Sequence, residues 1–281
     1  KIDRTLQETP NSVDVITAED LKNYNINTLD DAFTQSANVA STFGGTGYVI
    51  RGIANTNVTG TGVADLATTF IDGAPASRDI TFSGPLNLWD IQQVEVLRGP
   101  QSTLQGRNTL AGAVVIKTND PTYHWTGQAR IQYMDEPNEK RIGVAVGGPL
   151  IEDQLAFRIA AETTSADGLI FNPIRDEFIS ESDSTQVRAK LLFEPEAIPD
   201  LRMMLTHTYD TREYGDNISA FSIEDDYDNR QSFANDPIED EAEFNITVFQ
   251  VDYNINDYWS ITSLSTLDKS KRERRRDGDL G

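Results

Sequence analysis

After Pro121, the sequence becomes a series of roughly ten-residue segments in which apolar and polar residues alternate. An alternation with period two places the two kinds of side chain on opposite faces of a β-strand. The clear segments lie at 128–133, 141–146, 155–162, 187–194 and 201–206, and less regular ones lie at 243–254 and 258–270. This part of the chain is therefore predicted to form about seven antiparallel strands.

The connections between these segments differ in length in a regular way. Short connections at 150–153, 196–200 and 255–257 alternate with long polar ones at 166–183 and 213–242, and the one at 135–140 is intermediate. Outer-membrane β-barrels show this asymmetry, with tight turns on one side and long loops on the other. A soluble sandwich of short strands predicts no such alternation. Because about seven strands do not close a barrel around a large domain, we expect the chain to be a fragment.

The composition excludes several classes of partner and site. The 281 residues carry a formal net charge of −21 and contain no cysteine. The negative charge argues against nucleic acid or an anionic lipid surface as the main partner. The absence of cysteine excludes a disulfide scaffold and cysteine-based zinc sites. No apolar run approaches the roughly 18 residues that a membrane-spanning helix requires.

Residues 1–122 follow a different pattern and predict a mixed α+β domain. Thr17 is expected to begin a short helix as its N-cap, with Asp20 as the acidic partner of a capping box. A second helix is expected from Thr28 to Gln35, and a third short one within 86–91. Extended runs predict strands at 9–17, 48–52, 69–73, 94–98 and 114–116.

The stretch from 94 to 118, VEVLRGPQSTLQGRNTLAGAVVIKT, joins two β-branched runs through Gly and Pro residues. It resembles the signature of the plug domain of TonB-dependent outer-membrane receptors. Gln105 stands where tyrosine is usual, and Ala113 stands where a second glycine is common. The opening at 10–21 and the Arg-Gly step at 51–52 are also similar to this family. The resemblance therefore covers most of the predicted α+β domain.

The resemblance implies an α+β plug domain in residues 1–122, followed in 123–281 by antiparallel transmembrane β-barrel strands. These strands would be the first part of a barrel of about twenty-two strands. It further implies active transport across the bacterial outer membrane of a scarce extracellular ligand, by default a ferric siderophore. Cobalamin, haem or an oligosaccharide are the alternatives. The implied partners are a TonB-type inner-membrane energising complex, which would bind a short box upstream of Lys1, and outer-membrane lipid and lipopolysaccharide.

Two arginines, Arg51 and Arg98, each precede a glycine at the end of a predicted strand. The resemblance implies that they face glutamates of the barrel wall and hold the plug as a reversible charged latch. Those glutamates would lie beyond residue 281. The alternative is that each arginine belongs to a turn and points to water.

Five side chains in loops expected to face the outside are suited to hydrogen bonding or to stacking on a polar ligand. They are Tyr48, Asn55, Asn57, Arg78 and Phe82. For each of them, an ordinary role in a loop is the alternative interpretation.

The charged runs allow more than one interpretation. The acidic stretch at 223–243 offers oxygen ligands for a divalent cation, but it lacks the glycine of an EF-hand loop, and a solvated extracellular loop is preferred. The basic run at 269–276 is expected to meet lipopolysaccharide phosphates or to line the entrance of the lumen. His124 and His207 stand alone in the sequence, and structural roles are expected for both.

The sequence contains no dinucleotide-binding fingerprint, phosphate-binding loop, nucleophile elbow or zinc-protease motif. We therefore predict no catalytic residue, no cofactor and no resident metal. A second hypothesis of a different class stays open, in which a plug-like module and a β-rich domain form a binding or adhesion protein that does not transport.

Overall fold

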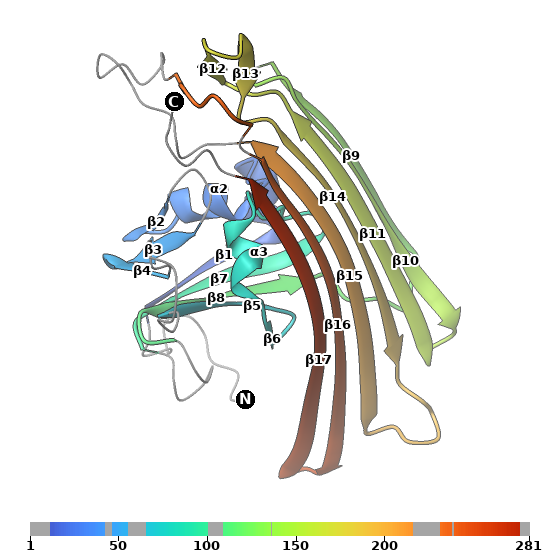
Figure 1. Ribbon diagram of the computed structural model, residues 1–281. Helices are drawn as coiled ribbons and strands as arrows, with labels where there is room; N and C mark the ends of the chain where they lie inside the picture. The colour runs from blue at the N-terminus through green and yellow to red at the C-terminus, as the bar shows by residue number, and fades with distance from the viewer. Residues whose placement is uncertain are drawn as a thin grey trace. The chain divides into compact units, whose positions relative to one another are not determined.

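The computed structural model describes residues 12–42, 47–55, 66–100, 109–135, 137–215, 231–237 and 239–275. The chain divides into two compact units, Lys1–Asn119 (unit 1) and Asp120–Gly281 (unit 2). The sequence predicts the boundary at residue 122. We describe each unit by itself (Figure 1).

The described residues of unit 1 form two β-sheets and three short helices. Its main sheet has five strands in the spatial order β1-β7-β8-β5-β6. Their bounds are Ser12–Thr17 for β1, Ile91–Arg98 for β7, Gly112–Thr118 for β8, Ala67–Ile71 for β5 and Ala74–Pro75 for β6. Neighbouring strands are antiparallel except β5 and β8, which are parallel. The smaller sheet consists of β2 (Val39–Ser41), β3 (Tyr48–Ile50) and β4 (Ile53–Ala54).

The two β-branched runs predicted at the ends of 94–118 form the centre of this unit. Val94 lies opposite Ile116, and Val96 lies opposite Val114, in the ladder between β7 and β8. All four side chains are buried in the main hydrophobic core. Branched side chains pack well on a pleated surface, so this pairing fixes the middle of the sheet.

The helices of unit 1 begin where the sequence supplies a cap. They are α1 (Ala18–Asn23), α2 (Leu29–Thr34) and α3 (Arg78–Phe82). Thr17 and Asp20 form a capping box at α1, and Thr28 and Asp31 form a second one at α2. The hydrogen bonds that the Thr17 hydroxyl and N–H donate to Asp20 lower the pKa of that carboxyl below its ordinary value. Both predicted helix starts are confirmed. The capping box of α1 is the predicted one, whereas that of α2 was not predicted from the sequence.

The helix expected within 86–91 is not present, and this corrects the prediction. The stretch instead forms an isolated bridge at Asn87 and a turn at Trp89 and Asp90, because its backbone bonds to another segment of unit 1. The N–H of Leu29 donates to the carbonyl of Leu86 at 2.9 Å, and that of Leu88 donates to the carbonyl of Asn27 at 2.8 Å. The sequence also gave no indication of α3.

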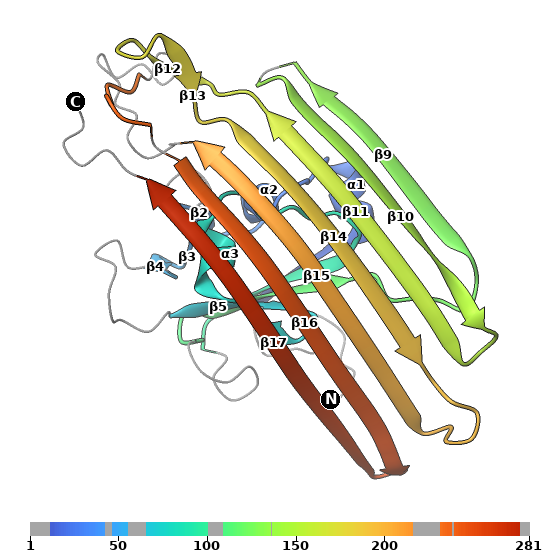
Figure 2. The same ribbon diagram turned by 45° about the vertical axis from the view of Figure 1, so that its right-hand side comes forward.

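Unit 2 is built around one antiparallel sheet of seven strands that are neighbours in chain order (Figure 2). A separate hairpin lies in the connection between the third and fourth of them. The sheet strands are β9 (Thr126–Met134), β10 (Glu139–Ile151), β11 (Leu155–Ala166), β14 (Ser182–Phe193), β15 (Leu201–Gly215), β16 (Glu239–Asn256) and β17 (Trp259–Arg275), and the hairpin is β12 (Ile170–Asn172) and β13 (Glu177–Ile179). The alternating segments of the sequence thus correspond to the strands of this sheet. Among the described helices, none has the length and apolar character needed to cross a membrane.

The two faces of the seven-stranded sheet differ in chemistry. The face that we call the apolar face presents a large exposed hydrophobic side chain from every strand. Examples, one per strand, are Ile131, Ile142, Ile159, Val187, Leu205, Phe249 and Leu267. Because successive residues of a strand alternate, the polar residues between them lie on the opposite face, which we call the polar face. In the sheet of a water-soluble protein, the hydrophobic side chains are buried and the polar side chains are exposed.

Side chains on the polar face bond to one another across strands. Asp210 accepts hydrogen bonds from Gln186 on β14 at 3.2 Å and from Arg212 at 2.6 Å. The guanidinium of Arg212 also lies 5.3 Å from the centre of the Phe244 ring on β16. These contacts connect three neighbouring strands, so the charges of Asp210 and Arg212 are paired within unit 2.

Candidate functional site

The two arginines selected from the sequence lie close together in unit 1. A Cβ atom on Gly99 would lie 3.4 Å from Nη1 of Arg51, so this guanidinium lies against the backbone beside Arg98. The N–H of Arg51 donates to the carbonyl of Asn38 at 2.8 Å. Nη1 of Arg98 donates to the carbonyl of Ala37 at 2.7 Å. Both arginines therefore bind the same short segment.

Arg51 occupies a tight turn. Arg51 and Gly52 connect β3 to β4 with φ values of 52° and 79°, which is the geometry of a type I′ turn. Asp72 and Gly73 make the same kind of turn between β5 and β6, with φ values of 50° and 82°. Arg51 is exposed. It thus agrees with the alternative in which the arginine belongs to a turn, although its side chain remains available to a partner.

Arg98 is engaged within unit 1. Its Nη2 lies 2.8 Å from Oδ1 of Asp14, and its side chain is only 12% exposed. Asp14 belongs to β1 and Arg98 ends β7, so the ion pair connects the edge strand to its neighbour. Arg98 therefore does not point to water.

Two of the five predicted ligand contacts belong to the interior, which corrects the prediction for both. Tyr48 is 1% exposed, its ring centre lies 5.1 Å from that of Phe33, and its hydroxyl lies 3.2 Å from Oγ1 of Thr69. Asn55 is also buried, and its Oδ1 accepts a hydrogen bond from the N–H of Tyr48 at 2.7 Å. The polar atoms that made these residues attractive are used to hold the hairpin of β3 and β4.

Arg78 and Phe82 lie together on α3. The guanidinium carbon of Arg78 is 4.5 Å from the centre of the Phe82 ring, and both residues are partly exposed. Residues four apart on a helix share a face, which brings this pair together. The sequence analysis selected both residues but not their contact, because it did not predict the helix. Asn57 lies outside the described residues.

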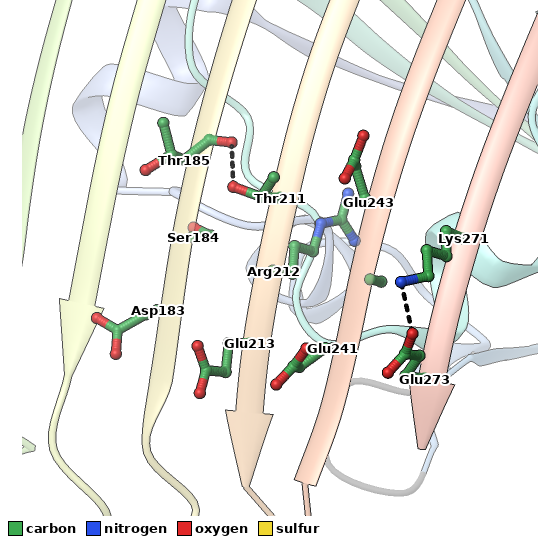
Figure 3. A pocket seen from close by; sticks show the side chains of 11 residues that line it. Asp183, Ser184, Thr185, Thr211, Arg212, Glu213, Glu241, Glu243, Lys271 and Glu273 are labelled. Atoms are coloured by element: carbon green, nitrogen blue, oxygen red, sulfur yellow. Dashed lines mark hydrogen bonds and ion pairs between the residues drawn. The ribbon is translucent and has the colours of Figure 1, made fainter.

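A pocket of about 270 Å³ lies on the sheet of unit 2 (Figure 3). It is lined by residues of β14 to β17, namely Asp183, Ser184, Thr185, Thr211, Arg212, Glu213, Glu241, Ala242, Glu243, Lys271 and Glu273. The register places Asp183, Glu213, Glu241 and Glu273 opposite one another on successive strands, so four carboxylates form a row on the apolar face. Nζ of Lys271 lies 2.5 Å from Oε1 of Glu273.

This row of carboxylates is not a metal centre. Within the described ranges, no group of three or more His, Cys, Asp or Glu side chains has an arrangement that could hold a metal ion. The two histidines agree with this. His124 is exposed, and Nδ1 of His207 lies 2.9 Å from the hydroxyl of Thr247.

The acidic and basic runs of the sequence meet in the structure. Residues 239–243 of the acidic stretch are the start of β16 and not a loop, which corrects the prediction for this part. Asp240 pairs with Arg272 and with Arg274 on the polar face of β17, and its side chain is 4% exposed. Lys271 and Glu273 lie on the apolar face. The basic run is therefore divided between two faces, which an analysis of each run by itself did not reveal.

Comparison with known proteins finds similarity to TonB-dependent receptors. The model of the TonB-dependent receptor plug domain matches residues 5–113. The ferrioxamine B receptor of Salmonella typhimurium is 26% identical over 178 residues, which is 60% of this chain and 24% of the receptor. The iron-regulated outer membrane virulence protein of Vibrio cholerae is 30% identical over 181 residues, which is 58% of this chain and 26% of that protein. The chain spans about a quarter of the length of these relatives.

Solved structures show the same fold. The ferric yersiniabactin uptake receptor of Yersinia pestis matches 96% of this chain and 42% of its own, with a TM-score of 0.84 and 19% identity. The ferripyoverdine receptor of Pseudomonas aeruginosa matches 93% of this chain and 34% of its own, with a TM-score of 0.72 and 18% identity. The structural match therefore extends well past the plug into the antiparallel strands. Residues 5–113 thus match the plug domain of TonB-dependent receptors, and the chain is similar in sequence and fold to outer-membrane receptors of this kind.

Proposed function

We propose that the chain is the plug and the first wall strands of a receptor that imports a ferric siderophore across the outer membrane. The ferrioxamine B and iron-regulated relatives, and the fold shared with yersiniabactin and pyoverdine receptors, support this ligand class. The single observation that carries the proposal is the sheet of unit 2, which follows a plug domain and has one apolar and one charged face. A wall between lipid and a wet pore requires these two faces.

In this proposal the sheet continues into a closed barrel of about twenty-two strands. An open sheet edge in lipid would leave backbone N–H and C=O groups without partners, at a cost of several kcal/mol for each group. The edges at β9 and β17 would therefore pair with further strands. The plug would fill the pore. A TonB-type inner-membrane complex would supply the energy, because no nucleoside triphosphate is available at the outer membrane.

Energy-dependent uptake tests this function. Cells that express the full-length receptor should accumulate a radiolabelled ferric siderophore only when the TonB-type complex is active. Deletion of residues 1–10 together with the region before them should abolish uptake, with the receptor present in the outer membrane at an unchanged amount. Hydroxamate, catecholate and phenolate chelates should be compared, with cobalamin, haem and an oligosaccharide as other classes. Uptake that persists without the energising complex would contradict the proposal.

The two arginines should have separable effects. Arg98→Gln removes the ion pair with Asp14 and the bond to Ala37, so it should lower the free energy of unfolding of unit 1 by about 1–3 kcal/mol. Arg51→Gln should leave this stability unchanged, because its exposed side chain forms no comparable ion pair with the residues of unit 1 that the structure describes. Urea unfolding followed by the fluorescence of the buried Trp89 measures both.

The same variants test the latch. We propose that the latch to a wall carboxylate uses Arg51, since Arg98 is bound to Asp14. Arg51→Gln should then make cells more sensitive to a large antibiotic that the intact outer membrane excludes. An unchanged sensitivity with a correctly inserted receptor would remove Arg51 from this role. A loss of stability in Arg51→Gln equal to that in Arg98→Gln would show that both arginines are structural.

A further inference from the structure

The first residues of unit 2, 120–125, bind the sheet of unit 2 on both of its faces. Asp120 and Tyr123 contact side chains of the polar face. Trp125 contacts the apolar face. We call residues 120–125 the anchor segment.

The carboxylate of Asp120 lies beside several positively charged side chains of the polar face. Lys190 on β14 lies directly opposite Arg158 on β11, and both residues are almost fully buried. Two like charges that face each other in a ladder repel, and burial increases the repulsion. The carboxylate of Asp120 lies 3.0 Å from Nζ of Lys190 and 3.3 Å from Nη2 of Arg202 on β15. Withdrawal of Asp120 would therefore leave buried cations near one another without this carboxylate.

Tyr123 adds an apolar contact and a hydrogen bond. Its ring packs against Ala156, Leu192 and Met204, which come from three neighbouring strands. Its hydroxyl donates to Oε2 of Glu194 at 2.7 Å. Burial, together with this hydrogen bond, raises the pKa of the Tyr123 hydroxyl, which remains a donor at all physiological pH values.

Trp125 holds the segment from the other side of the sheet. Its indole ring covers Gly148, where a Cβ atom would come within 2.7 Å of the ring. It also lies edge-on to Phe157, with ring centres 5.8 Å apart. Gly148 and Phe157 are opposite one another on β10 and β11.

We propose that residues 120–125 are a fixed anchor that stays bound to unit 2 when unit 1 unfolds or rearranges. All of the contacts described above are made to unit 2, namely to β10, β11, β14 and β15 and to Glu194, which directly follows β14. Movement of the plug would therefore end at Asn119 and would not pull β9 from its partner β10. The proposal concerns conformational coupling alone and does not depend on which ligand is transported.

Two spin labels test this in the full-length receptor in lipid. The 281 residues contain no cysteine, so single cysteines can be labelled specifically within them. Tyr24→Cys places a label at an exposed position after α1 in unit 1, and His124→Cys places one in the anchor segment. With increasing urea, the label at position 24 should become mobile at a lower concentration than the label at position 124.

Weakening the anchor should remove this separation. In Asp120→Asn/Tyr123→Ala the two labels should become mobile at the same urea concentration. Asp257→Asn changes an exposed aspartate in the turn between β16 and β17 and should keep the two midpoints apart. If the double variant does not fold, Asp120→Asn and Tyr123→Phe should each move the midpoint at position 124 toward that at position 24. Coincident midpoints in the unmodified anchor, or separate ones in all the weakened variants, would overturn the proposal.

Discussion

Gly112→Ala should destabilise unit 1 by about 3 kcal/mol or more, which for a unit of this size is a large part of its stability. Gly112 begins β8 between two strands and has a φ of +156°. A Cβ atom there would lie 2.2 Å from the carbonyl oxygen of Leu97 and 3.0 Å from Cδ1 of Ile50. The first of these neighbours is backbone, so the clash can be relieved only by separating β7 from β8.

The matched control is Gly52→Ala. Gly52 also has a positive φ, +79°, but a Cβ atom there would meet no other atom within 4 Å. This variant should cost only the conformational strain of a left-handed residue, about 1–2 kcal/mol. Urea unfolding followed by Trp89, with Trp125 and Trp259 replaced by phenylalanine, compares the two. Equal losses in the two variants would show that the close approach of Leu97 has no energetic importance.

This pair of glycines explains one departure of the sequence from the plug signature. The signature commonly has a second glycine where this chain has Ala113. Ala113 is fully buried in a small cluster with Phe70 and Leu97, so a methyl group fills space there. At Gly112 the same methyl group would overlap backbone. Sequence reading found the motif but could not tell which of the two positions requires glycine, because the answer depends on a strand distant in the sequence.

Asp240→Ala should destabilise unit 2 by about 3 kcal/mol, because it removes the acceptor shared by two arginines. The carboxylate of Asp240 accepts hydrogen bonds from Nε of Arg272 at 2.7 Å and from the hydroxyl of Tyr214 at 3.2 Å. It also forms an ion pair with Arg274, whose Nε lies 3.2 Å away. Its side chain is 4% exposed, so water does not replace it as a partner of these donors. The unfolding of the full-length receptor by urea in lipid, followed by circular dichroism, gives the loss.

Glu273→Gln is the control for this variant. Glu273 lies one residue from Arg272 in the sequence but on the other face, and it pairs with Lys271 where both side chains are well exposed. An exposed ion pair contributes little to stability, so the unfolding midpoint should hardly change. A larger loss for Glu273→Gln than for Asp240→Ala would mean that the apolar face, and not the polar face, carries the important charges.

The strands of unit 2 could be predicted from the sequence because their information is local. A period of two in the residues of β10 or β11 is visible without knowledge of any partner strand. The capping box of α1 was predictable for the same reason, since Thr17 and Asp20 are three residues apart. The conformation of residues 86–91 was not predictable, because their hydrogen bonds go to residues 27–29.

The contacts of the candidate sites depend on register, which the sequence pattern does not contain. Tyr48 and Asn55 are residue types that often contact ligands. The turn at Arg51 instead brings them together in the interior, where they are hydrogen-bonded to each other. The pairing of Asp240 with Arg272 and Arg274 likewise requires the alignment of β16 with β17. The sequence shows which residues are charged, but it does not show which of them pair across strands.

The opposite chemistry of the two sheet faces restricts how such a chain can change in length during evolution. Deleting one residue within β17 would move Arg272 and Arg274 to the apolar face and hydrophobic residues to the polar face. Deleting two residues would return every side chain to its original face of the sheet and would change only which residues pair across strands. Length differences among homologous chains should therefore be even-numbered inside these strands.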